Sequence, residues 1–121
     1  NANAGDDTIE VAIAGLTSAD TIDGGDGTDR IVFTTNGTID DVQFTNVTNT
    51  EAVSLAAGAN TINLGAQAQE AGIYLVYGNS GNDTITAGAG NDVIDAGNGD
   101  DIIQGEGGND IAKYLVGQKI I

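Results

Sequence analysis

The sequence lacks histidine, cysteine, proline, methionine and tryptophan, and it contains only five aromatic residues. Without histidine or cysteine it offers no Ser–His or Cys–His nucleophile pair, no zinc site of the usual kind and no disulfide framework. No apolar run approaches the length needed to cross a bilayer, so we expect no membrane insertion. The 121 residues suffice for one domain. These absences exclude most enzyme chemistries.

Positive charge is scarce as well. Three Lys and Arg residues stand against eighteen Asp and Glu, which gives a net charge of −15. So acidic a chain repels nucleic acids and anionic membranes, and neither is an expected partner. The apolar fraction of 40%, carried mainly by Ala, Ile, Val and Leu, is too high for a disordered acidic tail. We expect a thin aliphatic core and a surface that needs cations.

The sequence is organised by a nine-residue repeat. Residues 78–113 divide without remainder into four nonapeptides, each with Gly at position four and Asp at position six. The first three have Ile at position eight, and the fourth has Ala112. Residues 24–32 match G-G-x-G-x-D-x-U-x at every specified position, where U is a large aliphatic residue. Residues 15–23 and 2–10 are degenerate copies of the same pattern.

The repeat has a direct structural interpretation. Positions one to six turn the chain, because Gly and Asn tolerate positive φ. Positions seven to nine are long enough only for a short strand, whose central aliphatic side chain points to one face. Two repeats return the chain to its start, and coils stack at about 4.8 Å. The pattern predicts an all-β fold, a parallel β-roll or β-solenoid, whose interior ladders contain Ile22, Ile31, Ile85, Ile94 and Ile103.

This stacking brings carboxylates together at the turns. It places Asp83 over Asp101 and Asp92 over Asp110, where two charges about 5 Å apart repel by roughly 3 kcal/mol at an effective dielectric constant of 20. Ca²⁺ is the natural neutralising ion, since it accepts six to eight oxygen ligands in flexible geometry. Asp7 and Asp29 are a similar candidate pair, with residues 11–14 as a four-residue bulge in that coil.

The nonapeptide resembles the calcium-binding repeat of the repeats-in-toxin (RTX), or haemolysin-type, family. The resemblance implies a β-roll in which the position-six Asp and the carbonyls of the Gly-rich turns bind Ca²⁺. Asp7 and Asp20 belong to the degenerate copies, for which a solvated turn residue is the alternative. Carried onto this sequence, the ligand set comprises Asp7, Asp20, Asp29, Asp83, Asp92, Asp101 and Asp110, with turn residues Gly24, Gly27, Gly78, Gly81, Gly88, Gly90, Gly97 and Gly99.

The middle of the chain breaks the nonapeptide phase and is poorer in acidic residues. It contains one candidate helical turn, Ala66–Ala71, stopped by Gly72, and strand-like pieces at residues 42–44, 52–55, 61–64 and 74–77. It loosely resembles the inserts between RTX blocks in bacterial surface-layer and adhesin-like proteins. The expected organisation is one continuous solenoid: N-terminal RTX-like coils at 1–32, wider calcium-poor coils at 33–77, the regular β-roll at 78–113, and a terminal strand or cap at 114–121.

The functional expectation is a calcium-binding structural module rather than an enzyme. The adjacent acids Asp40–Asp41 and Asp100–Asp101 are poor candidates for a glycosidase pair, because sequence neighbours on a strand point to opposite faces. The resemblance implies a secreted bacterial surface protein of the S-layer, adhesin or filament type, exported by type I secretion without a cleaved leader. The expected partners are calcium ions and either further copies of the chain or a cell-surface polysaccharide. The alternative is the C-terminal secretion and folding β-roll of an extracellular enzyme or toxin.

Overall fold

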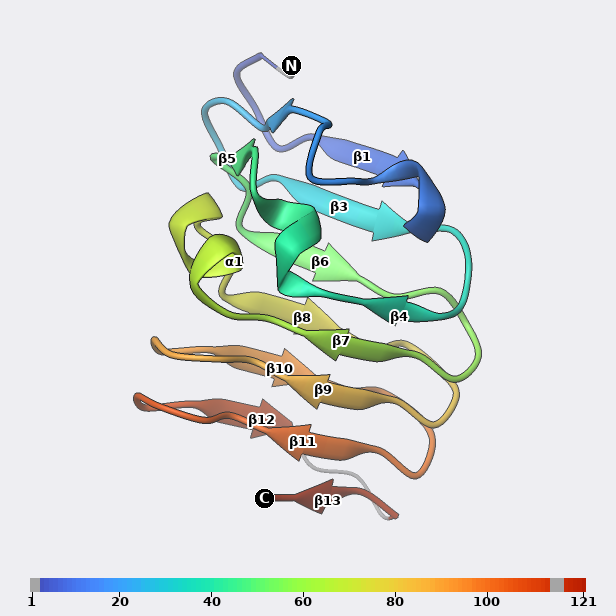
Figure 1. Cartoon of the computed structure of the whole chain (residues 1–121). Helices are drawn as coiled ribbons and strands as arrows, with labels where there is room; N and C mark the ends of the chain where they lie inside the picture. Colours follow the sequence, from blue (N-terminus) through green and yellow to red (C-terminus); the bar gives the residue numbers. More distant parts are fainter. Residues whose placement is uncertain (1–2, 114–116) are drawn as a thin grey trace.

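The computed structural model describes residues 3–113 and 117–121, and it shows a solenoid of stacked coils with the two termini at opposite ends (Figure 1). Two parallel sheets face each other across the core. The six-stranded sheet has the order β1 (Thr8–Val11), β3 (Arg30–Phe33), β6 (Ala52–Ser54), β8 (Leu75–Tyr77), β10 (Val93–Asp95), β12 (Ile111–Lys113). The five-stranded sheet has the order β13 (Lys119–Ile120), β11 (Ile102–Gln104), β9 (Thr84–Thr86), β7 (Thr61–Asn63), β4 (Thr38–Ile39). The predicted parallel β-roll is therefore confirmed.

The core consists of two aliphatic ladders, one from each sheet. The strands are mostly three residues long, and the central side chain of each points inward, as the alternation of a strand requires. The ladders are built from Ile31, Val53, Val76 and Ile94 on one side and Ile39, Ile62, Ile85 and Ile103 on the other. All eight are at most 1% exposed.

Coil length changes along the solenoid. In the six-stranded sheet, paired residues are 22 apart between β1, β3 and β6, 23 apart between β6 and β8, and 18 apart from β8 onward. The wide coils thus begin at β1, before residue 33. Their interior is filled by larger groups, including Phe33 and Phe44, whose rings meet edge to face at 6.3 Å.

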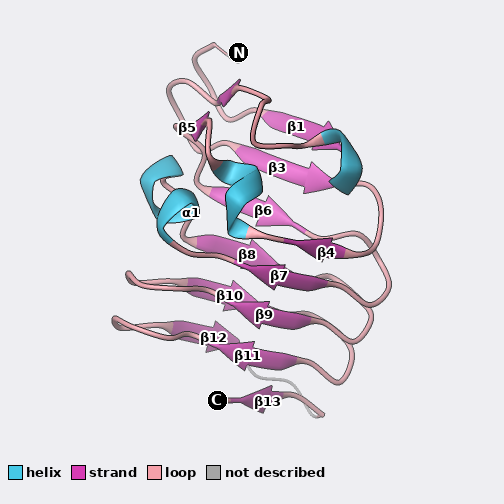
Figure 2. Ribbon diagram, in the orientation of Figure 1, coloured by secondary structure: helices cyan, strands magenta, loops and turns pink. Residues whose placement is uncertain are grey.

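The additional residues of the wide coils form short helices, and those that the structure describes all lie before Gly72 (Figure 2). They are η1 (Ile13–Gly15), η2 (Asp41–Phe44) and α1 (Ala66–Ala71). The prediction of a helical turn at Ala66–Ala71 is confirmed: Gly72 ends it in the left-handed region, with φ of 102°. None of the described helices is long and apolar enough to span a membrane.

Three local predictions were wrong. The strand expected at residues 42–44 is the 3₁₀ helix η2, because Asp40 and Gln43 form a capping box at its start. Ile22 is only partly buried, since β2 (Ile22–Asp23) pairs with β5 (Val47–Thr48) outside the two main sheets. The bulge expected to begin at Val11 starts later, because Val11 still pairs with Phe33 and the following residues form η1.

Strands were correctly predicted within 52–55, 61–64 and 74–77. Of the segment 114–121, residues 114–116 lie outside the described residues. Its strand β13 pairs with β11 and continues the solenoid.

Candidate metal centre

The residue immediately before a strand connects neighbouring coils through its side-chain oxygen. In the six-stranded sheet, the backbone N–H of Asp7 donates to Oδ1 of Asp29, and that of Asp29 donates to Oε2 of Glu51, both at 2.8 Å. Further along, the N–H of Asp92 donates to Oδ1 of Asp110 at 2.9 Å. Each carboxylate thereby holds the start of a strand in the preceding coil.

The five-stranded sheet repeats this arrangement on the opposite side of the solenoid. The N–H of Gly37 donates to Oδ1 of Asn60 at 3.1 Å, and the N–H of Asn60 donates to Oδ1 of Asp83 at 2.9 Å. The N–H of Asp83 in turn donates to Oδ1 of Asp101 at 2.7 Å. The predicted stacking of Asp83 with Asp101, of Asp92 with Asp110 and of Asp7 with Asp29 is therefore confirmed.

The second carboxylate oxygen, Oδ2, has different hydrogen-bond partners in different members of this set. Oδ2 of Asp7, Asp29, Asp83 and Asp92 is buried and has no hydrogen-bond partner. By contrast, Oδ2 of Asp101 accepts a hydrogen bond from Nε2 of Gln118 at 3.0 Å. A buried carboxylate oxygen without a partner is costly, so these four positions require either a proton or a cation.

The cost of burying the charge is reflected in the pKa values of two of these carboxyl groups. Burial, against opposing hydrogen bonds from Asn60 and with a smaller contribution from the Asp101 carboxylate, raises the pKa of Asp83 to about 6. Burial and the Asp110 carboxylate likewise raise the pKa of Asp92 to about 6. At neutral pH both carboxylates are mainly ionised, although their surroundings disfavour the charge.

Position-one glycines leave space beside the unpartnered oxygens. A Cβ placed on Gly78 would lie 2.9 Å from Oδ2 of Asp83 and would collide with the carbonyl oxygen of Ala96. A Cβ on Gly24 would lie 2.6 Å from Oδ2 of Asp29 and would collide with the carbonyl oxygen of Asn49. In both places a carboxylate and a main-chain carbonyl from adjacent coils converge on a glycine.

The other predicted glycines line the stacked turns. A Cβ on Gly27, Gly81 or Gly99 would collide with the carbonyl oxygen of a glycine one coil earlier: Gly5, Gly58 or Gly81, respectively. The main-chain carbonyls of Asn79 and Leu64 lie close to Gly97 and Gly88 in the same way. Gly90 faces the side chain of Gln69 and has a positive φ of 111°. Glycine is required here both for backbone conformation and for close stacking.

Asp20 is placed differently from the other candidates. It lies in an exposed turn, where Oδ2 accepts hydrogen bonds from the backbone N–H and Oγ1 of Thr17, both at 2.8 Å. These hydrogen bonds lower the pKa of Asp20. Its interactions are therefore local to its own turn, unlike those of Asp29 or Asp83.

The arrangement suits a metal ion that binds main-chain carbonyl oxygens as ligands. Within residues 3–113 and 117–121, no three acidic, His or Cys side chains come together as a metal cluster. A bound cation would combine the buried Oδ2 atoms with carbonyls such as those of Ala96 and Asn49. Such an all-oxygen, mixed set is typical of Ca²⁺, whereas zinc sites use His and Cys. When bound, the ion supplies positive charge that offsets the desolvated carboxylates.

Comparison with protein-family models matched the RTX calcium-binding nonapeptide repeat in four copies, over residues 12–34 and 77–112. The chain carries RTX repeats. It is accordingly a calcium-binding structural module, and the matched segments contain Asp29, Asp83, Asp92 and Asp110. Searches among curated proteins and among solved structures gave no match to the chain.

Sequence reasoning overlooked three residues of the RTX solenoid. Glu51, Asn60 and Gln118 occupy the place before a strand that Asp holds in the regular repeats, and each contacts a position-six residue in a neighbouring coil. The sequence does contain a signal for Glu51 and Asn60. Each is an oxygen-bearing side chain directly before a short aliphatic strand, in the segment where the coils lengthen to 22 or 23 residues.

Proposed function

We propose that this chain is a calcium-folded structural module of a secreted bacterial surface protein of the S-layer, adhesin or filament type, with no catalytic role. The observation that carries the proposal is the set of buried, unpartnered carboxylate oxygens at Asp29, Asp83 and Asp92. These three residues are at most 4% exposed. The ligands we propose are the predicted position-six Asp residues and turn carbonyls, apart from Asp20.

Charge and calcium concentration together give the mechanism. At the submicromolar calcium of a cytosol, a net charge of −15 and the unpartnered carboxylates oppose folding. Outside the cell, millimolar calcium exceeds the roughly 10⁻⁴–10⁻³ M dissociation constants of extracellular calcium modules. Binding to the folded state then supplies folding free energy by linkage. This behaviour suits export as an unfolded chain, by type I secretion, followed by folding on the cell surface.

A structural role is favoured by the shape and composition of the molecule. Stacked coils form an extended surface of repeated turns, and no residue type suited to nucleophilic catalysis with a histidine base is present. One acid of each adjacent pair already has a structural role. Asp41, next to Asp40, accepts hydrogen bonds from the start of α1. Asp101, next to Asp100, connects two coils. We therefore propose self-association, or contact with a surface polysaccharide, as the activity of the folded module.

Circular dichroism of the 121-residue chain tests the calcium-dependent fold. We expect a coil spectrum in chelator at pH 7.5 and a β-sheet spectrum after addition of millimolar Ca²⁺. Mg²⁺ at the same concentration is the control, since it demands octahedral geometry and gives up water reluctantly. A chain that is fully folded in chelator, or one that folds equally with Mg²⁺, would contradict the proposal.

A further inference from the structure

One turn of the solenoid carries an amide where the next coil carries a carboxylate. Asn60 precedes β7 and Asp83 precedes β9, and the pairing of Thr61 with Thr84 places the two residues at equivalent positions of consecutive coils. Both side chains are buried, since the residues are 3% and 1% exposed. Comparing them shows the effect of a single exchange, because Asn has an NH₂ group where Asp has its second oxygen.

The first side-chain oxygen has the same role in both residues. Oδ1 of Asn60 accepts a hydrogen bond from the N–H of Gly37 at 3.1 Å, and Oδ1 of Asp83 accepts one from the N–H of Asn60 at 2.9 Å. Each oxygen thereby holds the residue that begins a strand in the preceding coil. This shared hydrogen bond orients the two side chains alike.

The second side-chain atom has a different environment in the two residues. Nδ2 of Asn60 donates to the carbonyl oxygens of Ala56 and Gly58 at 2.9 and 3.0 Å, and to Oδ1 of Asp83 at 3.2 Å. Carbonyl and carboxylate oxygens only accept hydrogen bonds, so the nitrogen of the amide, and not its oxygen, faces all three. Oδ2 of Asp83, by contrast, is buried and has no hydrogen-bond partner.

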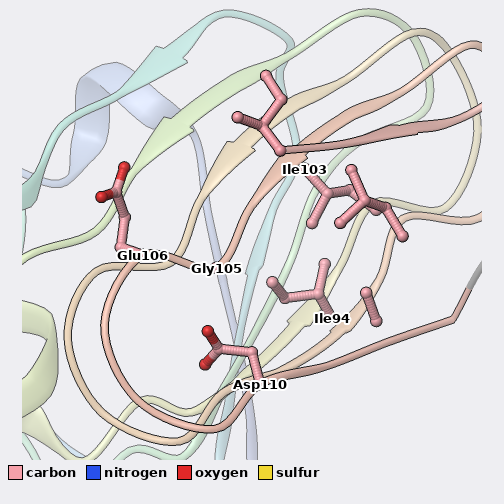
Figure 3. Close-up of a pocket in the computed structure, with 8 residues that line it drawn as sticks. Ile94, Ile103, Gly105, Glu106 and Asp110 are labelled. Carbon is pink, nitrogen blue, oxygen red and sulfur yellow. The ribbon is translucent and has the colours of Figure 1, made fainter.

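The carboxylates of the regular repeats face the first glycine of their own turn. A Cβ on Gly105 would collide with Oδ2 of Asp110, and Figure 3 shows the Asp110 carboxylate directed into the curve of this turn. The corresponding glycine for Asp83 is Gly78, where a Cβ would lie 2.9 Å from Oδ2 and would collide with the carbonyl oxygen of Ala96. A buried carboxylate oxygen in this place lies near a main-chain oxygen and has no donor, so its charge requires a cation.

We infer that the side-chain amide of Asn60 takes the place of a calcium ion, so that the turn at residues 56–60 closes without metal. The NH₂ group offers its hydrogens to two main-chain carbonyls and to the Asp83 carboxylate, the kinds of oxygen that Ca²⁺ binds. Because the amide is neutral, it also adds no charge repulsion to Asp83. On this side of the solenoid, the calcium-dependent turns therefore begin at Asp83.

The other polar groups of the wide coils agree with this assignment. The buried carboxylate oxygens that lack a partner belong to Asp7, Asp29, Asp83 and Asp92. None of them lies within residues 33–77, all of which the structure describes. The inference rests on the proposed function, because it takes calcium to bind in the regular coils. It goes further in naming a turn that excludes the ion and the group that replaces it.

The number of calcium ions bound per chain tests the inference. It is measured by equilibrium dialysis of the full chain against saturating millimolar calcium at pH 7.5. Asn60→Asp replaces the donor by a carboxylate oxygen, so an ion should enter the turn and the count should rise by one. Asn60→Ala removes the amide without adding a ligand, and it should leave the count unchanged.

Asn46→Asp is the matched control, because it makes the same exchange at an exposed amide, whose Nδ2 donates to the carbonyl oxygen of Ser18 at 2.8 Å. Its count should equal that of the parent chain. Circular dichroism of every sample in calcium shows whether the variant is folded, and Asn60→Asp should give the parent spectrum.

Three results would overturn the inference while the parent chain binds calcium. They are an unchanged count in Asn60→Asp, failure of Asn60→Asp to fold at any calcium concentration, and a count that falls by one in folded Asn60→Ala. The last result would mean that the Asn60 turn already holds an ion in the parent chain. A parent chain that binds no calcium would instead refute the proposed function, and this inference with it.

Discussion

Asp83 uses its two carboxylate oxygens for different purposes. Oδ1 accepts hydrogen bonds from the backbone N–H and Nδ2 of Asn60, at 2.9 and 3.2 Å. Oδ2 is buried without a partner, beside Gly78 and the carbonyl oxygen of Ala96. The first oxygen positions the strand of the preceding coil, and the second is available to a cation. At this scale, structural support and calcium affinity can be separated by a single substitution.

Asp83→Asn should separate these two contributions. The amide keeps an Oδ1 acceptor for Asn60 and removes a charge that burial disfavours. We expect the midpoint of a calcium titration, followed by circular dichroism, to rise about tenfold, equivalent to ~1.4 kcal/mol. Asp20→Asn, in an exposed turn, should leave the midpoint unchanged. Equal shifts for both variants would contradict a specific role for Asp83.

The close contact between glycines of neighbouring coils leads to a second prediction at the scale of single residues. Gly99 has φ of 129°, and a Cβ there would collide with the Gly81 carbonyl oxygen. Gly99→Ala should therefore lower the free energy of unfolding in calcium by about 1–3 kcal/mol. Gly107→Ala is the matched control, because its nearest neighbour would be 3.9 Å away and its φ is not positive. Urea denaturation of the two variants should differ clearly; similar losses would count against tight stacking at Gly99.

At the scale of elements, the short helix α1 depends on a residue from another coil. Its own N-cap is Gly65, which provides no side-chain cap. Instead, Oδ1 of Asp41 accepts hydrogen bonds from the N–H groups of Gly65 and Ala68, at 2.8 and 2.9 Å, and Oδ2 accepts one from Gln67 at 3.1 Å. A carboxylate at the N-terminal end of a helix also interacts favourably with the helix dipole.

Removal of that cap should destabilise the wide coils. Asp41→Ala leaves the first amides of α1 without their acceptor, and we expect a loss of about 1–2 kcal/mol in the free energy of unfolding. Glu70→Ala, an exposed substitution on the same helix, should change stability by less than about 0.5 kcal/mol. Thermal unfolding in calcium compares them. A cap that contributes nothing would give the two variants the same melting temperature.

The elements also show how far sequence reasoning extends. The strands at 84–86, 93–95 and 102–104 follow from the nine-residue period alone, since turn and aliphatic positions recur without interruption. The helix η2 could not be read in this way, because Val42-Gln-Phe44 alternates like a strand. Its form depends on the reciprocal capping of Asp40 and Gln43, together with the long-range burial of Phe44. The contact between Asp41 and α1 likewise depends on coil stacking, which local patterns do not specify.

At the scale of the whole molecule, the raised pKa values make the metal-free solenoid sensitive to pH. Asp83 and Asp92 have folded-state pKa values of about 6, above the ordinary aspartate value of 3.8. The folded state therefore binds more protons than the unfolded state between about pH 4 and pH 6. Its stability is greatest at the acidic end of this range and falls as the pH rises through the folded-state values. At low pH a proton neutralises the same desolvated carboxylates whose charge a bound calcium ion would offset at neutral pH.

The calcium-free chain, which we expect to be a coil at pH 7.5, should accordingly show more β-sheet signal in circular dichroism at pH 5. In millimolar Ca²⁺ the difference should shrink or reverse, because protons then compete with the ion for the same oxygens. The double variant with Asp83→Asn and Asp92→Asn should show a weaker pH dependence without calcium. A calcium-free β-sheet signal that rises with pH would be inconsistent with the raised pKa values.

Side-chain hydrogen bonds between coils run in opposite directions at two kinds of position. Before a strand, the connecting amide belongs to one coil, and the side-chain oxygen that accepts its proton belongs to the next coil along the chain. In the turns, the backbone N–H groups of Thr28, Asp100 and Asn109 donate instead to side-chain oxygens of the preceding coil. Removal of a coil from either end therefore leaves an amide of the neighbouring coil without its side-chain acceptor. Because each such coil depends on both of its neighbours, we expect the solenoid to tolerate truncation poorly from either side.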